Sequence, residues 1–228
     1  MPLISHRGAA GLAPENSLEA ITIANRYKPV YIEVDIHRTI DGIFVLYHGD
    51  MKRTLSGAPR PETFNLLKLS RPYLTTLNKA LKHKSSAPYI FDIKFTEGIH
   101  DLIKTLRDER MPESYSFTSP HPGALFELKK AFPKSKTFIS QPYWHGPIAA
   151  FELARDYGFT GITLNKWWLN PFTSWLCKRY GKQLNVYTIN HSLWIWAAQR
   201  FFPHAFITTN YPNRYRKHFT INKLSGEK

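Results

Sequence analysis

The sequence predicts an α/β fold, a small closed (β/α)8 barrel with a short arm after its second strand. Short β-branched or aromatic runs alternate with helical patterns, eight such runs occur, and 228 residues suffice for one large α/β domain. No long proline-, glycine- or serine-rich linker interrupts the chain. We therefore expect residues 1–228 to form a single domain.

The predicted elements follow one another in βαβ order. Strands are expected at 3–6, 31–36, 89–94, 115–118, 136–140, 161–164, 184–188 and 205–208. Helices are expected at 17–27, 77–83, 98–110, 122–131, 147–157, 171–180 and 192–201, several of them opened by proline or serine. A further run at 43–47 follows the turn signal Asp41-Gly42, and we expect it to form the arm beside the second strand.

The chain is strongly basic, with 31 Lys and Arg against 17 Asp and Glu and a formal net charge of +14. This charge favours anionic partners such as phosphorylated metabolites, nucleic acids or acidic membrane surfaces. The basic residues are dispersed, and no zinc-finger spacing, basic heptad region or RNA-binding aromatic signature occurs. We therefore expect no nucleic-acid partner, and nothing in the sequence indicates an obligate protein partner.

The cellular compartment follows from the first residues and from the cysteine content. The first predicted strand begins at Leu3, where a signal peptide would otherwise lie, and no apolar run approaches the roughly 20 residues of a bilayer span. The single cysteine, Cys177, excludes an internal disulfide and is expected to pack in the core. These features predict a cytoplasmic protein.

Three carboxylates are predicted to meet at one end of neighbouring strands. Glu33 and Asp35 are two residues apart, so their side chains leave the same face of a strand and can chelate one ion. Asp92, in the next barrel strand, would add a third oxygen ligand for a hard divalent cation, Mg²⁺ or Ca²⁺. Lys94 shares the face of Asp92 and could meet a phosphate oxygen. The alternative is an amphipathic edge strand with two solvated acids.

Two histidines add acid–base groups to these carboxylates. His6 precedes Arg7, a fixed positive charge that can hold a phosphoryl group, and His48 follows the predicted arm. Cleavage of a phosphodiester needs one group to accept a proton and another to donate one, and two histidines around a metal-held phosphate can do both. The alternative for a single histidine at a strand end is a structural, hydrogen-bonded imidazole.

These residues match a family pattern. The series runs through His6-Arg7-Gly8, Pro14-Glu15-Asn16-Ser17, Glu33-Val34-Asp35, Thr39-Ile40-Asp41-Gly42, Val45 and His48. It resembles the N-terminal signature of glycerophosphodiester phosphodiesterases. Similar segments continue along the chain at 73–77, 91–94, 116–117, 186–190 and 206–212.

The resemblance implies a (β/α)8 barrel, a divalent metal on Glu33, Asp35 and Asp92, and acid–base catalysis by His6 and His48. It also implies phosphate contacts from Arg7 and Lys94, and it assigns the organisation of the first loop to Glu15 and Asn16. The implied reaction cleaves a glycerophosphodiester into glycerol 3-phosphate and an alcohol, commonly with the glycerol 2-hydroxyl attacking phosphorus first and water opening the cyclic intermediate.

Four positions depart from the usual family pattern. The family usually has glutamate where Asp92 stands, although aspartate there also occurs in the related spider-venom sphingomyelinases D, whose disulfides this chain cannot form. The other departures are the inserted Gly49, Tyr187 in place of tryptophan, and Asn210 in place of aspartate. We expect Asp92 to affect the choice of metal, Gly49 to affect the loop of His48, and Tyr187 and Asn210 to affect the support of the site.

Aromatic residues follow the fifth and sixth predicted strands, at 141–145 and 165–172, where loops would shape the substrate pocket. Trp167 and Trp168 are expected either to contact substrate, with peripheral contact to a membrane surface, or to close over the barrel as core. Trp194 and Trp196 lie in an apolar helix and are expected to pack between this helix and the barrel.

Three functions remain open. The first is metal-dependent hydrolysis of water-soluble glycerophosphodiesters. The second is a lysophospholipase D or sphingomyelinase D-like activity, with a lysophospholipid as substrate and its acyl chain held by the aromatic rim. The third is an inactive phosphate- or lipid-binding barrel. A decayed site would be expected to lack one of His6, His48, Glu33 or Asp35, and all four are present.

Overall fold

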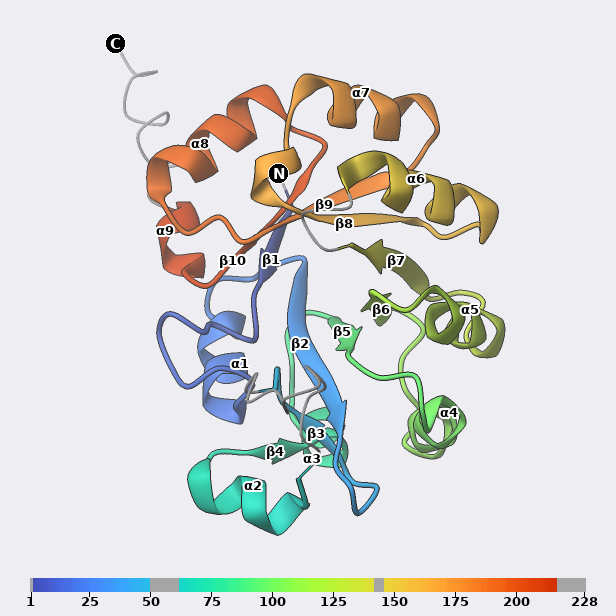
Figure 1. Ribbon diagram of the computed structural model, residues 1–228. Coiled ribbons are helices and arrows are strands. Elements are labelled where there is room, and N and C mark those ends of the chain that lie inside the picture. The colour runs from blue at the N-terminus through green and yellow to red at the C-terminus, as the bar shows by residue number, and fades with distance from the viewer. Residues whose placement is uncertain (1, 50–61, 142–145, 217–228) are drawn as a thin grey trace, which may run out of the picture.

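The computed structural model describes residues 2–49, 62–141 and 146–216. Its centre is a closed barrel of parallel strands, which helices surround on the outside (Figure 1). The barrel strands are β1 (Leu3–Ser5), β2 (Tyr31–Arg38), β5 (Tyr89–Ile93), β6 (Ser116–Ser119), β7 (Lys136–Ser140), β8 (Gly161–Asn165), β9 (Gln183–Tyr187) and β10 (Phe206–Thr209). Because β1 pairs with both β2 and β10, the sheet closes on itself.

The arm and the helices complete the fold. In the arm, β3 (Phe44–Leu46) pairs antiparallel with β2, and β4 (Thr75–Thr76) pairs antiparallel with β3. The helices are α1 (Leu18–Asn25), α2 (Phe64–Ser70), α3 (Leu77–Lys82), α4 (Ile99–Asp108), α5 (Pro122–Ala131), α6 (Gly146–Asp156), α7 (Pro171–Arg179), α8 (Ser192–Phe201) and α9 (Pro212–Arg216), with a 3₁₀ turn, η2 (Lys166–Trp168).

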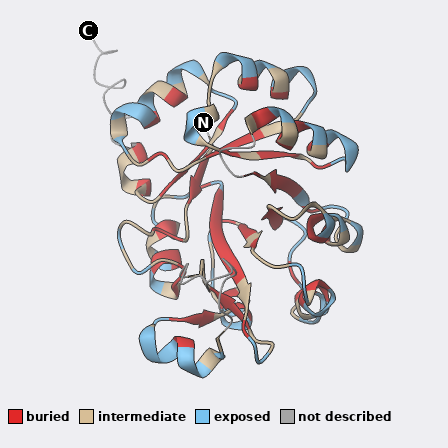
Figure 2. Ribbon diagram, in the orientation of Figure 1, coloured by how far each residue is buried: buried red, intermediate tan, exposed pale blue. Residues whose placement is uncertain are grey.

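The two faces of each strand have different surroundings. Outward side chains such as Val34, Ile162 and Val186 pack with the buried sides of the helices into one hydrophobic core. Buried residues accordingly follow the strands and the inner helix faces, whereas the outer helix faces are exposed (Figure 2). Inside the barrel, Ile4 and Tyr31 belong to a small apolar cluster near the amino ends of the strands.

Close packing inside the sheet explains one glycine. A β-carbon on Gly161 would lie 2.0 Å from the carbonyl oxygen of Gln183 on the neighbouring strand, so only glycine allows β8 and β9 to pair here.

Above the apolar cluster, toward the carboxyl ends of the strands, the inward residues become polar. The barrel interior is therefore apolar at the amino ends of the strands and polar at the carboxyl ends, where the site lies.

The predicted fold is confirmed, with element ends that shift by one or two residues. The strand at 136–140 and the helices at 122–131 and 192–201 have the predicted bounds. The arm is confirmed as well, because Gly42 adopts a φ of +79° in the turn that leads into β3. Helices α2 and α9, strand β4 and the turn η2 were not predicted.

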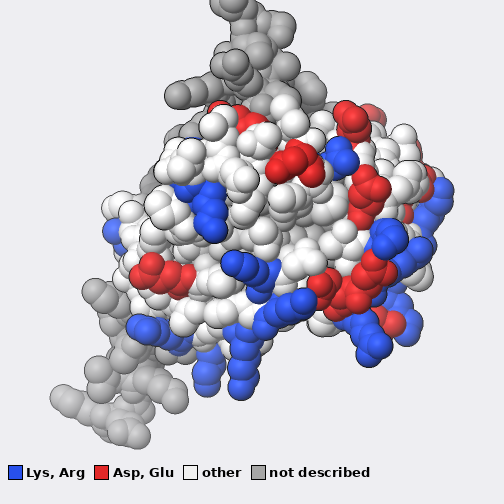
Figure 3. Space-filling view, turned by 90° about the horizontal axis from the view of Figure 1, so that it is seen from below, with Lys and Arg blue, Asp and Glu red and all other residues white. Residues whose placement is uncertain are grey.

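Two further predictions concern burial and surface charge. Cys177 is buried in the core, as expected. On the face seen from below Figure 1, basic side chains lie among acidic ones, in agreement with the dispersed charge of the sequence (Figure 3). Within the described ranges, the helices are too short or too polar to cross a bilayer.

Candidate active site

A polar cavity of about 520 Å³ opens at the carboxyl ends of the barrel strands. Every barrel strand, or the loop that follows it, contributes to the lining, because inward side chains of parallel strands converge at this end. The lining residues are His6, Arg7, Glu33, Asp35, His48, Asp92, Lys94, Thr118, Ser140, Thr163, Asn165, Lys166, Tyr187, Thr188, Asn190 and Thr208.

The structure brings the three predicted carboxylates together. Asp35 and Asp92 are direct partners in the pairing of β2 with β5, and Glu33 lies two residues before Asp35 on the same face. One carboxylate oxygen of each residue lies within 4.8 Å of the others. Glu33 and Asp35 are buried, so the alternative of two solvated acids on an edge strand is wrong.

Asp35 is the most heavily bonded member of this cluster. Its Oδ2 accepts a hydrogen bond from Asn16 Nδ2 at 2.9 Å and lies 3.1 Å from Arg7 Nε, while its Oδ1 lies 3.1 Å from Lys94 Nζ. The backbone N–H of Asp35 donates to Asn16 Oδ1 at 3.1 Å. Lys94 also pairs with Asp92. Two cations and one amide therefore compensate the buried carboxylates in this structure.

The three carboxylates differ in their acidity. Burial alone would raise the pKa of Asp35, but the charges of Lys94 and Arg7 outweigh it and hold that pKa below its usual range. Burial, followed by the charges of Asp35 and Asp92, raises the pKa of Glu33 well above its usual range. Burial also raises the pKa of Asp92, although Lys94 opposes that shift. The cluster thus holds more negative charge than its neighbours fully compensate.

The first loop places Arg7 over this cluster. The Arg7 backbone N–H donates to Glu33 Oε2 at 2.9 Å, and Arg7 Nη1 donates to Glu15 Oε2 at 2.7 Å. Arg7 has a φ of +50°, a conformation that side chains other than glycine and asparagine rarely adopt. Gly8 follows with a φ of +79°, and a β-carbon there would lie 2.7 Å from the β-carbon of Ala20. The close approach of this loop to α1 therefore requires glycine.

His6 is held by a hydrogen bond at one side of its ring, and the other side faces the carboxylates. Its Nδ1 lies 2.5 Å from Asn210 Oδ1, and its Nε2 faces Glu33 Oε2 at 3.8 Å. Since an amide oxygen only accepts hydrogen bonds, this contact places the proton on Nδ1 and leaves Nε2 as the acceptor toward the cavity. Burial, followed by the charge of Arg7, lowers the pKa of His6 to about 4. Asn190 Oδ1 in turn accepts from the Asn210 backbone N–H at 2.9 Å.

Asn210 offers a test of this arrangement through the pH dependence of turnover. Asn210→Asp puts a carboxylate beside Nδ1, and a neighbouring negative charge raises the pKa of an imidazolium. The limb of the pH–rate profile that His6 controls should therefore move to higher pH, whether His6 acts as base or acid. Asn210→Ala is the control, because it removes the positioning contact without adding charge. An unchanged profile in Asn210→Asp would show that His6 does not control turnover.

His48 reaches the same cavity from the arm. It follows β3, which runs antiparallel to the end of β2 and so returns the chain toward the barrel. Burial, the largest influence, lowers the pKa of His48, so its imidazole is neutral near neutral pH. The cavity thus contains two neutral imidazoles from distant parts of the chain.

The cluster of Glu33, Asp35 and Asp92 fits a hard divalent cation. All of its donors are carboxylate oxygens, the ligand type that Mg²⁺ and Ca²⁺ prefer. Asp92 Oδ1 is buried and, among the described atoms, lacks a hydrogen-bond partner, as expected of an oxygen reserved for a ligand. The raised pKa of Glu33 agrees with such a site: burial is its largest cause and repulsion by Asp35 and Asp92 the next, and an added cation would relieve that repulsion.

The aromatic residues of the rim separate into two groups. Trp168 is half-buried and packs against the hydrophobic core, whereas Trp167 is 73% exposed and lies beside the cavity mouth with Lys166. The expected packing of Trp194 and Trp196 between helix and barrel is wrong, because they are 65% and 44% exposed. Helix α8 instead buries Ile195 and Ala198, and its tryptophans lie on other faces.

Sequence reasoning missed the neutral polar lining of the cavity. Thr118, Thr163 and Thr208 occupy inward positions near the carboxyl ends of their strands, and Ser140 ends β7. A period-2 pattern that changes from apolar to polar within each short strand could have identified them. The two residues that support His6, Asn190 and Asn210, lie in the loops after β9 and β10.

Residues 6–140 match the sequence pattern of the glycerophosphoryl diester phosphodiesterase family. This chain belongs to that family. The match includes His6, the three carboxylates, His48 and Lys94. The family membership predicted from the sequence motifs is confirmed.

Known members of this family resemble the chain in sequence. It is 39% identical to human glycerophosphodiester phosphodiesterase 1 over 82 residues, which are 36% of this chain and 23% of the human protein. It is 23% identical over 211 residues to a glycerophosphodiester phosphodiesterase of Caldanaerobacter subterraneus, over 82% of this chain and 85% of that protein. The more similar alignment therefore spans under a quarter of its relative's length.

Solved structures of similar proteins share the fold. A glycerophosphodiester phosphodiesterase from Parabacteroides distasonis has a TM-score of 0.79 at 21% identity, over 97% of this chain and 98% of that one. A phosphodiesterase from Oleispira antarctica, solved in complex with its product sn-glycerol-3-phosphate, also has a TM-score of 0.79 at 21% identity, over 96% and 97% of the two chains. These likenesses confirm the closed parallel barrel.

Proposed function

We propose that this protein hydrolyses glycerophosphodiesters to glycerol 3-phosphate and an alcohol, with a divalent cation as cofactor. The observation that carries the proposal is the presence of His6, His48 and three convergent carboxylates in one cavity of a family member. The structural relative from Oleispira antarctica binds glycerol 3-phosphate, which supports the same product here.

The histidines exchange protons with the substrate in this proposal. One imidazole accepts the proton of the attacking hydroxyl, and the other donates a proton to the oxygen of the departing alcohol as its bond to phosphorus breaks. If the glycerol 2-hydroxyl attacks first, the imidazoles exchange roles when water opens the cyclic phosphate. The lowered pKa values of both residues keep them neutral near neutral pH, so the imidazole that acts as base is ready to accept a proton, and the one that acts as acid takes up a proton before it donates it.

The remaining charged residues bind and orient the phosphate. Arg7 and Lys94 place two positive charges in the cavity lining, and both already contact Asp35 of the carboxylate cluster. Glu15 restrains Arg7, and Asn16 restrains Asp35, so the first loop is ordered before substrate binds. A divalent cation held by Glu33, Asp35 and Asp92 would act as a Lewis acid that neutralises charge on the phosphate oxygens.

An inactive phosphate-binding barrel is the less favoured function. A barrel that only bound phosphate would have no use for a buried carboxylate cluster, because buried like charges are unfavourable unless a cation compensates them. Here that cluster is kept and is supported by Arg7, Asn16 and Lys94. The arrangement favours an enzyme.

The test measures glycerol 3-phosphate released from glycerophosphocholine and glycerophosphoethanolamine, with Mg²⁺ or Ca²⁺ added. We expect turnover with a divalent cation, loss of turnover with excess chelator, and recovery when the cation is restored, because carboxylates without a cation repel an anionic substrate. Full turnover in chelator would disprove the metal requirement. Absence of turnover with every divalent cation tried, in a protein that binds the cation, would disprove the activity.

A further inference from the structure

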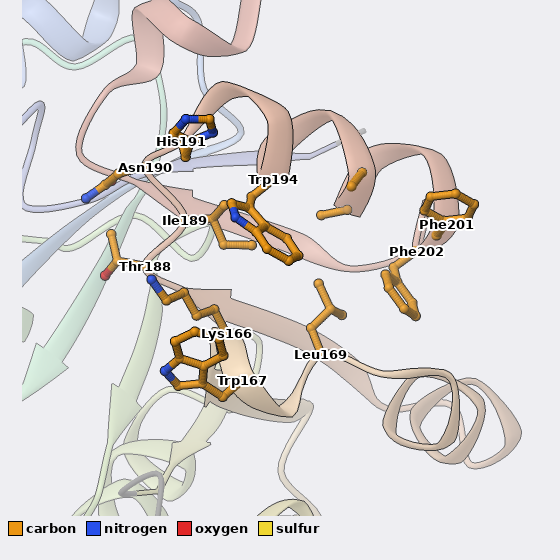
Figure 4. A pocket seen from close by; sticks show the side chains of 12 residues that line it. Lys166, Trp167, Leu169, Thr188, Ile189, Asn190, His191, Trp194, Phe201 and Phe202 are labelled. Carbon is orange, nitrogen blue, oxygen red and sulfur yellow. The ribbon is translucent and has the colours of Figure 1, made fainter.

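A second cavity, of about 440 Å³, lies between η2 and α8. Its size is within the usual range of about 300–1,000 Å³ for sites that bind small ligands. The walls are mainly apolar: Trp167 and Leu169 line one side, and Trp194, Phe201 and Phe202 line the other (Figure 4). Such a wall binds hydrocarbon rather than a sugar or a phosphate.

This apolar cavity adjoins the catalytic one. Lys166, Thr188 and Asn190 line both cavities, and Asn190 also supports Asn210, the hydrogen-bond partner of His6. In Figure 4 the polar residues Thr188 and Asn190 lie at one end of the apolar cavity, and Phe201 and Phe202 lie at the other. One molecule with a phosphodiester and a hydrocarbon chain can therefore occupy both cavities.

Exposed residues at the rim of the cavity also suit a molecule with a phosphodiester and a hydrocarbon chain. Trp194 and Phe201 are 65% and 67% exposed although they line the cavity. The Nζ of Lys166 lies over the ring of Trp167, 5.1 Å from its centroid. Large apolar side chains that remain exposed around a cavity commonly mark a binding site. The paired lysine and tryptophan suit the junction between a hydrocarbon chain and an anionic phosphate.

We propose that the cavity between η2 and α8 binds the hydrocarbon chain of a lysophospholipid whose phosphodiester lies in the catalytic cavity. The inference rests on the proposed function and specifies its substrate class. Water then adds its hydroxyl to phosphorus, the bond from phosphorus to the head-group alcohol breaks, and the proton passes to that alcohol. The products are an acylglycerol 3-phosphate and the free alcohol.

The test compares lysophosphatidylethanolamines with hexanoyl, octanoyl and decanoyl chains, each below its critical micelle concentration, with chain-free glycerophosphoethanolamine. Each methylene that enters the cavity should raise kcat/KM by up to about fourfold, which corresponds to the transfer of one CH₂ group from water. Glycerophosphoethanolamine should be hydrolysed less efficiently than every lysolipid. Equal kcat/KM values across the chain lengths would overturn the proposal.

Two substitutions and a matched control assign the effect to this cavity. Trp194→Ala removes one wall and Ala197→Phe fills the space, and both should flatten the dependence on chain length while turnover of glycerophosphoethanolamine stays near that of the wild type. Trp196→Ala, on the same helix with a 44% exposed side chain outside the cavity lining, should change neither. If Trp196→Ala and Trp194→Ala had equal effects, the cavity would not be the chain-binding site.

Equilibrium binding in excess chelator separates this inference from the proposed function. Decanoyl lysolipid should bind the metal-free protein more tightly than hexanoyl lysolipid, and Trp194→Ala should remove the difference. Binding of this kind without turnover of any diester would refute the proposed function and leave the cavity assignment intact. Turnover of glycerophosphoethanolamine without chain-dependent binding would do the reverse. A wild-type dimer that Trp194→Ala dissociates would show that a second copy covers the cavity, and would also overturn the proposal.

Discussion

His6→Ala and His48→Ala are each expected to lower the turnover of a glycerophosphodiester by roughly 10²–10⁴-fold, the contribution of a positioned acid–base group. Both imidazoles line the catalytic cavity, and His6 is held by Asn210 so that its Nε2 faces the carboxylates. The measurement is kcat on glycerophosphoethanolamine under saturating metal. Metal affinity, measured by calorimetry on the same variants, should change much less.

His37→Ala is the matched control for this prediction. His37 lies on β2, two residues after Asp35, and its Nδ1 is 2.9 Å from the carbonyl oxygen of Arg38. Its loss should leave kcat near the wild-type value. A His6 or His48 variant that turned over substrate as fast as His37→Ala would show that the missing imidazole has only a structural role.

Asp35→Asn and Glu33→Gln are both expected to abolish tight metal binding but to change the stability of the metal-free protein in opposite directions. Asp35 compensates both Arg7 and Lys94, so its neutralisation leaves each cation with one carboxylate partner, Glu15 and Asp92, and should lower the free energy of unfolding by at most about 3–5 kcal/mol. The ionised form of Glu33 is disfavoured by burial and by its neighbouring carboxylates. A neutral glutamine at this position should therefore raise the free energy of unfolding. Titration calorimetry and urea unfolding in chelator measure the two effects.

The pH dependence of these variants gives an independent check. The folded-state pKa of Glu33 is raised, so its ionisation destabilises the metal-free protein as pH rises, and Glu33→Gln should remove that loss of stability. The pKa of Asp35 is lowered, so its contribution is present at neutral pH and disappears as pH falls into the acidic range. If both variants changed stability in the same direction at neutral pH, our assignment of charge within the cluster would be wrong.

Most of the barrel could be predicted from local sequence patterns. Short β-branched runs and proline- or serine-initiated helices carry their own signals, so the strand at 136–140 and the helix at 122–131 have the predicted bounds. Helix α2 was missed because its seven residues, Phe64–Ser70, bury only Leu67 and show little apolar periodicity. Trp194 and Trp196 were wrongly predicted to pack against the barrel, because an apolar helix buries only one face and the sequence does not show which face that is.

The sequence by itself determined the strand order, the spacing that puts Glu33 and Asp35 on one face, and the presence of two histidines near strand ends. These are local properties, set by the two-residue period of a strand and by turn residues such as Asp41-Gly42. Only the tertiary structure decided that Asn210 holds His6 across 204 residues of chain, and that the apolar cavity opens between η2 and α8. Such contacts depend on closure of the barrel, which brings β1 against β10 and joins residues that no local pattern connects.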